Sequence, residues 1–176
     1  MSEATEQVHA QAPAQDEFPV IPDLHWTEQL QTGDTRMDDT HEEFVDLLAR
    51  LRATPHADQL PLYRELMQHT VEHFGQEDRW MVTVGFSADN CHASQHASIL
   101  DTMRTVEQHY LQGDLDIIDR MAAALAEWFP MHAQSMDAGL AQHMKTVEFD
   151  SRTETLADPS RVRPASMSGC GSVTCS

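Results

Sequence analysis

Basic residues and long apolar runs are both scarce in this sequence. Only 11 lysines and arginines stand against 29 acidic residues, which gives a formal net charge of -18. A surface this acidic repels phosphate groups and anionic lipid headgroups, so we expect no binding to nucleic acid or to a membrane surface. No apolar stretch approaches the roughly 20 residues that a membrane-spanning helix needs. We therefore expect no membrane insertion.

Cysteine is scarce as well. The 3 cysteines are too few for a disulfide framework, which is consistent with a reducing compartment. The N-terminus lacks the basic and apolar regions of a secretory signal, so we expect a cytoplasmic protein. Cys170 and Cys175 have the spacing of neither a redox motif nor a zinc motif. Their role stays open between a disordered tail and a redox or partner contact.

Composition divides the chain into three parts. Residues 1–23 are rich in Gln, Ala, Pro and Glu, and residues 150–176 are rich in Ser, Thr, Gly, Pro and Arg. Neither part shows periodicity, which predicts a flexible N-terminal arm and a disordered C-terminal tail. Residues 24–149 carry apolar side chains at helical spacing, and short loops between long amphipathic helices favour an all-α, antiparallel up-down-up-down four-helix bundle. The expected helices cover about 39–53, 59–83, 90–112 and 115–147.

Histidine, by contrast, is abundant, with 11 residues. Several histidines and one glutamate lie on the apolar stripes of the expected helices. A buried polar side chain without a partner costs roughly 1–3 kcal/mol, so this many in one small core need a common partner. A metal ion is such a partner, because imidazole and carboxylate are common ligands. The residues concerned are His41, His73, Glu77, His92, His96 and His132.

Hairpin geometry predicts that these side chains meet. In an antiparallel helix pair, residues equidistant from the loop lie at the same height along the bundle. Reflecting the midpoint of His92 and His96 through the following loop gives position 132. Reflecting it through the preceding loop gives position 78, next to Glu77. Reflecting residue 75, midway between His73 and Glu77, through the first loop gives position 39, within one turn of His41. All four helices therefore bring candidate ligands to one layer.

Asp137 has a weaker case by this reasoning. At i+5 from His132 it is rotated about 140° around an ideal helix, and geometry alone favours position 136, which is Met136 and cannot serve. Pro130 adds an irregularity, because it removes a backbone donor and clashes with the carbonyl of the preceding turn. We expect a kink near this residue.

The motifs around these residues resemble those of the hemerythrin family, in particular the single-domain bacteriohemerythrins, over about residues 24–147. The family pattern places a Trp before D-x-x-H, then H-F-x-x-E, an aromatic after Gly ahead of H-x-x-x-H, and a Trp before H-x-x-x-x-D. The matching residues are Trp26 with Asp38 to His41, His73 to Glu77, Gly85-Phe86 with His92 to His96, and Trp128 with His132 and Asp137.

This resemblance implies a di-iron centre (Fe2+/Fe3+) in which Glu77, Asp137 and an oxo or hydroxo group bridge the metals. One iron would have three histidine ligands, and the other would have two and bind O2 at an open position. The implied ligands are His92, His96 and His132 for the first iron and His41 and His73 for the second. Phe74, Trp128 and Phe129 match positions that line the oxygen pocket, although Trp128 also has an alternative as simple core packing.

The same resemblance implies a protein that is not an enzyme and that binds oxygen for storage, transport or delivery. Its partners would be molecular oxygen and, beyond it, an oxygen-consuming enzyme. The stripes carry no additional acid or base, which argues against catalysis. Two alternatives stay open: a redox or diatomic-gas (O2 or NO) sensor, and an iron-handling protein.

Overall fold

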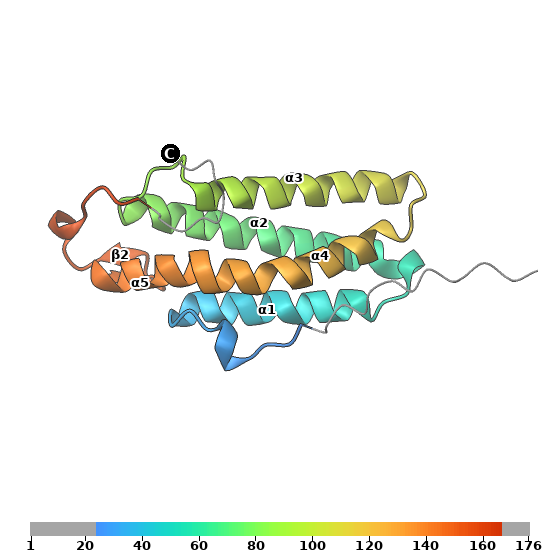
Figure 1. Cartoon of the computed structure of the whole chain (residues 1–176), viewed down its shortest axis with the longest axis horizontal. Helices are drawn as coiled ribbons and strands as arrows, with labels where there is room; N and C mark the ends of the chain where they lie inside the picture. Colours follow the sequence, from blue (N-terminus) through green and yellow to red (C-terminus); the bar gives the residue numbers. More distant parts are fainter. Residues whose placement is uncertain (1–23, 167–176) are drawn as a thin grey trace, which may run out of the picture.

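A computed structural model describes residues 24–166 as a bundle of long helices that lie side by side (Figure 1). The arm expected at residues 1–23 and the residues 167–176, with Cys170 and Cys175, lie outside the described range. The long helices that follow one another along the chain run antiparallel, and α1 (Thr35–Arg52) also contacts α4 (Ile117–His132), which closes the bundle. The predicted all-α four-helix bundle is confirmed. Among the described residues, no helix is long and apolar enough to cross a bilayer.

The bundle has four long helical segments, whose bounds are nearly those that the sequence predicts. The fourth segment consists of α4 and α5 with a π-helical turn, η3, between them, and a small hairpin of two strands follows it. The elements are η1 (Glu28–Leu30), α1 (Thr35–Arg52), η2 (His56–Asp58), α2 (Gln59–Thr83), α3 (Cys91–Leu111), α4 (Ile117–His132), η3 (Ala133–Asp137), α5 (Ala138–Thr146), β1 (Phe149–Asp150), β2 (Thr155–Leu156) and η4 (Pro159–Arg161).

Side-chain caps fix the start of two helices. The Asp34 carboxylate accepts a hydrogen bond from the backbone N–H of Met37 at 3.0 Å, so α1 begins at Thr35, earlier than its apolar stripe indicates. The Asn90 side chain accepts from the N–H of Ala93 at 2.9 Å and starts α3. Each cap satisfies a backbone donor that the helix itself leaves unpaired.

Two apolar clusters occupy the interior, and α1 and α2 contribute buried residues to both. The larger cluster includes Phe44, Leu66, Met103 and Leu125. The smaller cluster includes Met37, Trp80, Leu140 and Phe149. On α1 and α2, and along the segment from α4 to α5, the candidate ligands fall between residues of the larger cluster and residues of the smaller one. The polar layer therefore lies between two apolar regions that shield it from water along the bundle axis.

Residues 149–166, which we call the C-terminal strap, differ from the sequence-based prediction. The sequence predicted a disordered tail from residue 150, whereas β1 pairs with β2 and the chain then turns back across the end of the bundle (orange to red in Figure 1). The Ser151 hydroxyl is buried and donates to the carboxylate of Asp34 at 2.7 and 2.9 Å. Such contacts have no helical or strand periodicity, so periodicity did not indicate them.

Near its end the strap pairs with the loop between α2 and α3. The backbone N–H of Ala165 donates to the carbonyl of Gly85 at 2.9 Å, as part of a parallel bridge between Phe86 and Ala165. Gly85 has a φ of +102°, and a Cβ atom there would collide with the carbonyl oxygen of Arg163. The position thus requires glycine both for its backbone conformation and for the close approach of the strap.

Gly85→Ala is therefore expected to destabilise the protein more than Gly113→Ala. Both glycines have a left-handed φ, at +102° and +105°, so each alanine introduces backbone strain of about 1–3 kcal/mol. Only Gly85 has a neighbouring backbone in the way, because nothing lies within 4 Å of a Cβ at Gly113. Urea denaturation of both variants measures the difference. Equal losses of stability would mean that the strap contact at Gly85 contributes nothing.

Candidate metal centre

Seven buried side chains converge between the two apolar clusters. Their ligand atoms form two groups that could each hold a metal ion, and both groups contain Glu77 and Asp137. The first group adds His92, His96 and His132, and the second adds His41 and His73. Each of the seven side chains is at most 4% exposed. The structure therefore brings together every ligand that the sequence and the family resemblance proposed.

Helical periodicity positions most of these residues. His73 and Glu77 lie one turn apart on α2, and His92 and His96 lie one turn apart on α3, so each pair shares a helix face. His41 comes from α1, which packs against α2. All of them are on the inner faces of the bundle.

The last two ligands depend on the π-helical turn. His132 ends α4 and Asp137 ends η3, and the N–H of Ala138 bonds to the carbonyl of Ala133, five residues earlier. Bonding from i to i+5 widens the turn and brings residues five apart onto one face. This explains why Asp137 is a candidate ligand although an ideal α-helix would turn it away. Pro130, where a kink was expected, lies inside α4 just before this turn.

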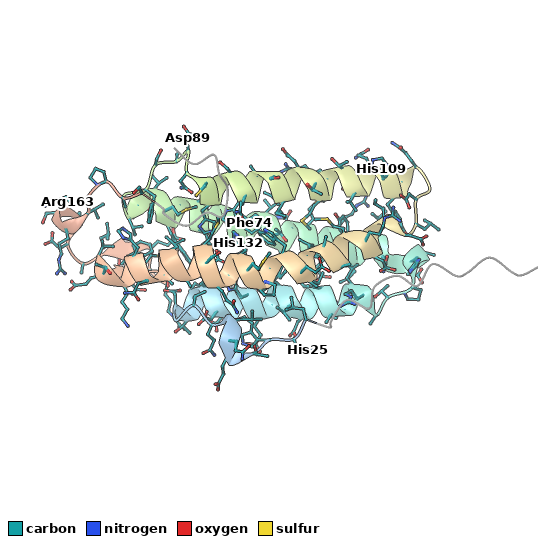
Figure 2. The ribbon with its side chains drawn as sticks, viewed as in Figure 1. His25, Phe74, Asp89, His109, His132 and Arg163 are labelled. Atoms are coloured by element: carbon teal, nitrogen blue, oxygen red, sulfur yellow. The ribbon has the colours of Figure 1, made fainter. Side chains whose placement is uncertain are left out.

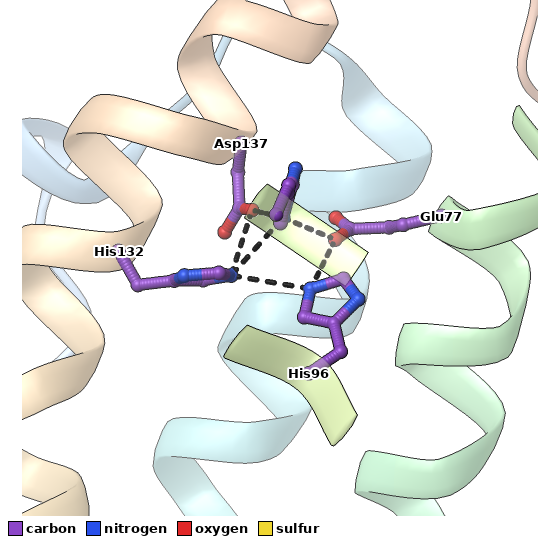
Figure 3. Close-up of side chains that lie close together, drawn as sticks. Glu77, His96, His132 and Asp137 are labelled. Carbon is purple, nitrogen blue, oxygen red and sulfur yellow. Dashed lines mark hydrogen bonds and ion pairs between the residues drawn. The ribbon is translucent and has the colours of Figure 1, made fainter. Parts of the chain in front are cut away.

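The three-histidine group has its ring nitrogens directed at one point (Figure 3). The Nε2 atom of His132 lies 3.2 Å from that of His92 and 3.3 Å from that of His96. The Oε2 atom of Glu77 lies 3.4 Å from the Nε2 atoms of both His92 and His96, and the Oδ1 atom of Asp137 lies 3.1 Å from that of His132. Metal–imidazole bonds of about 2.0–2.1 Å place adjacent ligand atoms roughly 3 Å apart, so these spacings suit one ion.

The two-histidine group is more open. The Nε2 atom of His41 lies 3.3 Å from Oδ2 of Asp137, and that of His73 lies 3.9 Å from Oε1 of Glu77. The carboxylates thus present one oxygen to each group, which is the arrangement of bridging ligands. A surface cavity of about 100 Å³ between α1 and α2 has His73 in its lining.

Partners outside the layer orient two of the imidazoles. The Nδ1 atom of His96 lies 2.9 Å from Oδ1 of Asp78, and that of His132 lies 3.2 Å from Oε1 of Gln95. An Nδ1–H that donates to such an acceptor leaves Nε2 unprotonated and free to bind a metal. Ligand spacing does not indicate these roles, because neither Asp78 nor Gln95 is part of the ligand pattern.

The buried charges influence one another strongly. Burial opposes ionisation of Glu77 and Asp137, but the surrounding histidines outweigh it and hold the pKa of each carboxyl below its ordinary value. Burial lowers the pKa of His73 to about 4. Burial also disfavours the charged form of His92, but Asp137 and Glu77 outweigh it and raise the pKa of that imidazole to about 9.

These pKa values predict that metal binding releases protons. At pH 7 the metal-free protein carries a proton on His92, whose pKa is raised to about 9, and a metal must displace it. Titrating ferrous iron anaerobically into metal-free protein should release about one or more protons per chain. Calorimetry in buffers of different ionisation enthalpy measures the count. His92→Gln should release fewer protons, and wild-type protein that releases none would contradict the electrostatic description.

The three aromatic residues assigned to the oxygen pocket lie against the ligand layer. Phe74 stacks on His96 with ring centroids 3.9 Å apart, and Trp128 stacks on His132 at 4.3 Å. Figure 2 shows Phe74 and His132 together inside the bundle. Phe129, by contrast, meets His41 edge-on at 5.1 Å. Phe129 thus lies beside the two-histidine group and Trp128 covers the three-histidine group, while Phe74 contacts both groups because its ring also lies 5.5 Å from that of His73.

The residues present fit a metal better than they fit a metal-free core. Both ring nitrogens of His41 and His73 and all four carboxylate oxygens of Glu77 and Asp137 are buried, and apart from the ion pairs among the seven side chains themselves they have no hydrogen-bond partner. Each unsatisfied group costs about 1–3 kcal/mol, which a bound ion would offset. The mixture of imidazole and carboxylate donors suits iron among the common metals.

The fold and the site together define this chain as a helical-bundle metal-binding protein, whose ligands are buried imidazoles and shared carboxylates. The sequence model of the hemerythrin HHE cation binding domain matches residues 32–144, and the chain belongs to the hemerythrin family. A bacteriohemerythrin of Ralstonia nicotianae is 30% identical over 137 residues, which cover 78% of this chain and 100% of that relative. A bacteriohemerythrin of Pseudomonas aeruginosa is 25% identical over 120 residues, 66% of this chain and 78% of the relative. The family implies non-haem iron as the metal, and the family resemblance inferred from the sequence is confirmed.

Proposed function

We propose that this chain binds molecular oxygen reversibly at a di-iron centre, for oxygen storage, transport or delivery. The observation that carries the proposal is the unequal distribution of ligands between two groups that share both carboxylates. Shared carboxylates hold two metals close together, and unequal ligand numbers make the two metals chemically different. The bacteriohemerythrins similar to this chain support the same reading.

The ligand count indicates where oxygen would bind. The group around His92, His96 and His132 has five protein ligands, and the group around His41 and His73 has four. A metal held by His41 and His73 would therefore have one protein ligand fewer than the other metal and would keep a coordination position for oxygen. We therefore assign the oxygen-binding position to the metal held by His41 and His73.

The surroundings of that position favour binding over further reaction. His41 is fully buried and has the rings of Phe129 and Trp26 against it, at 5.1 and 6.4 Å. An apolar wall excludes water and slows proton delivery, which protects a bound gas from irreversible reduction.

The iron ions supply the reversible redox chemistry that holds oxygen, and the chain supplies their environment. Glu77 and Asp137 stay ionised because the histidines lower their pKa values, so they offset the metal charge. Asp78 and Gln95 hold His96 and His132 in the tautomer that binds. Phe129 and its neighbours exclude water.

Oxygen uptake by the reduced, iron-loaded protein tests the proposal against an enzymatic role. An oxygen carrier takes up an amount of O2 equal to the amount of chain and then stops, even with excess ascorbate present. An enzyme or an iron-handling oxidase continues to consume O2 as long as reductant lasts. Measurement with an oxygen electrode separates the two, and sustained consumption at a rate proportional to protein would overturn the carrier assignment.

A further inference from the structure

A polar cavity opens on the surface between α1 and α2, beside the two-histidine group. This α1–α2 cavity has a volume of about 100 Å³, and its lining includes Glu43, His69 and Glu72 as well as His73. His73 is the only one of the seven candidate ligands in this lining, and it is also the most exposed of them. The cavity therefore brings the molecular surface to the ligand layer at His73.

Apolar and aromatic side chains cover the layer on other sides. The two apolar clusters lie on either side of it along the bundle axis, and Phe74 and Trp128 stack on rings of the three-histidine group. Iron reaches a buried site as a hydrated cation, and moving a charge through apolar surroundings is costly. A polar lining between two helices offers the ion oxygen and nitrogen atoms in place of its water.

Polar side chains lead from this cavity to the centre in order of increasing burial. Oε2 of Glu43 on α1 lies 3.2 Å from Nε2 of His69 on α2, and the rings of His69 and His73 have centroids 6.4 Å apart. The side chains of these three residues are 69%, 16% and 3% exposed, in that order. His69, His73 and Glu77 lie at successive turns of α2, so they share one face of the helix. The series thus ends at a carboxylate that both ligand groups share.

Glu43 and His69 have the separation of two ligands on one cation. Metal–imidazole bonds of about 2.0–2.1 Å place adjacent ligand atoms roughly 3 Å apart, and the two facing atoms lie 3.2 Å apart. The guanidinium of Arg36, which also lines the cavity, lies two turns away on α1 and donates to Oε1 of Gln76 at 3.3 Å. Its positive charge is therefore held away from the pair.

Two buried nitrogen atoms beside this pair also indicate a polar occupant. Within the part of the chain that the structure describes, Nδ1 of His69 and Nδ1 of His73 are buried without a hydrogen-bond partner. Buried polar atoms normally have such a partner. Because both residues line the cavity, a species inside it is the partner within reach.

We propose that Glu43 and His69 form an entry site for ferrous ions, from which His73 passes the ion to the metal centre. Carboxylate and imidazole donors suit a divalent iron ion. Two protein ligands hold an ion weakly, whereas the centre offers four or five to each metal, so the ion moves inward. Such an entry site serves the metal centre whether or not the loaded centre binds oxygen.

Anaerobic iron loading of the full-length, metal-free chain tests the entry site. Ferrous ammonium sulfate is added at about 0.15 M salt, an excess of a ferrous chelator stops uptake at increasing times, and the iron that stays with the desalted protein is counted. Glu43→Gln should slow loading about tenfold, the lower end of the range by which charged clefts accelerate ion capture. The final iron content should not change, because Glu43 belongs to neither ligand group.

Glu42→Gln is the matched control. Glu42 is an exposed neighbour on the same helix that does not line the cavity, so its replacement removes the same charge without removing the proposed contact. Its loading rate should change less than about twofold, since salt screens an exposed charge that does not contact the ion. His69→Gln should be as slow as Glu43→Gln, and the double variant should be little slower than either, because both residues act at one site.

Iron extraction from the reduced, iron-loaded protein provides the second measurement. An entry residue changes the rates in both directions equally and leaves the affinity unchanged, so a chelator should remove iron from Glu43→Gln about tenfold more slowly than from wild type. Loading of Glu43→Gln at the wild-type rate, equal slowing by Glu42→Gln, or slower loading without slower extraction would each overturn the proposal. All of these measurements count iron without oxygen present, so a failed oxygen-binding test would leave them unaffected.

Discussion

Asp137→Ala is expected to remove iron from the whole site, the largest effect that the ligand arrangement predicts. Asp137 belongs to both ligand groups, with Oδ1 near His92 and His132 and Oδ2 near His41. Its loss takes a ligand from each metal and leaves buried imidazoles without a partner. Iron per chain, measured by plasma mass spectrometry after desalting, should fall by more than about tenfold.

Two further variants make this result specific. His73→Ala removes a ligand from the two-histidine group alone, so roughly half of the iron should remain. Asp78→Ala removes only the acceptor at Nδ1 of His96, and affinity should fall by about 10–100-fold while the iron content at saturation persists. If Asp137→Ala kept its full iron, the assignment of Asp137 as a shared ligand would be wrong.

Phe129→Ala is expected to accelerate both autoxidation of the oxygenated protein and azide entry into the oxidised protein. Phe129 is 2% exposed and packs on His41 and on Phe44, with ring centroids at 5.1 and 4.9 Å. Its removal opens the wall beside the two-histidine group without touching a ligand. We expect a rate increase of roughly tenfold, equivalent to about 1.4 kcal/mol in the barrier. Stopped-flow absorbance measures both rates.

Trp128→Phe is the matched aromatic control. Trp128 stacks on His132, on the side of the three-histidine group, so its replacement should change the two rates much less. Phe129→Ala also creates a cavity that costs about 3–5 kcal/mol, and Phe129→Leu gives a smaller cavity if the alanine variant does not fold. Larger rate changes for Trp128→Phe than for both Phe129 variants would move the oxygen position to the other metal.

The fold and most of the ligand layer were predictable because they depend on periodicity. Apolar stripes define four amphipathic helices, and helix rise then determines which residues of neighbouring helices share a level. That reasoning places His92 opposite His132 and next to Glu77, as the structure confirms. No single motif was needed for this prediction. That candidate ligands from all four helices lie at the same height along the bundle axis is more specific than the spacing of two histidines within one helix.

Asp137 shows where helix periodicity fails. Its position depends on a π-helical turn over Ala133–Asp137, and no residue type in that turn distinguishes it from an α-helix. The resemblance to hemerythrins predicted Asp137 as a ligand, and the π-helical turn in the structure explains how it reaches the site. The proline at position 130 indicated an irregularity, but not that it would be a widened turn placed after the proline.

The C-terminal strap was missed for a different reason. Its attachment uses one backbone bridge, one buried hydroxyl on a helix cap, and a glycine that admits a second chain. These are contacts between residues far apart in sequence, and no local pattern encodes them. The same is true of Asp78 and Gln95, which matter only through the imidazoles that they contact.

The absorption spectrum of the reduced, iron-loaded protein under changing oxygen pressure tests the central claim most directly. The account predicts that a visible charge-transfer band appears when oxygen is admitted, disappears when it is removed under vacuum, and returns on readmission over repeated cycles. His41→Ala should abolish the cycle, because that residue holds the metal with the open position. Irreversible conversion of the wild-type protein to the oxidised spectrum on first exposure, with no band that vacuum removes, would contradict it.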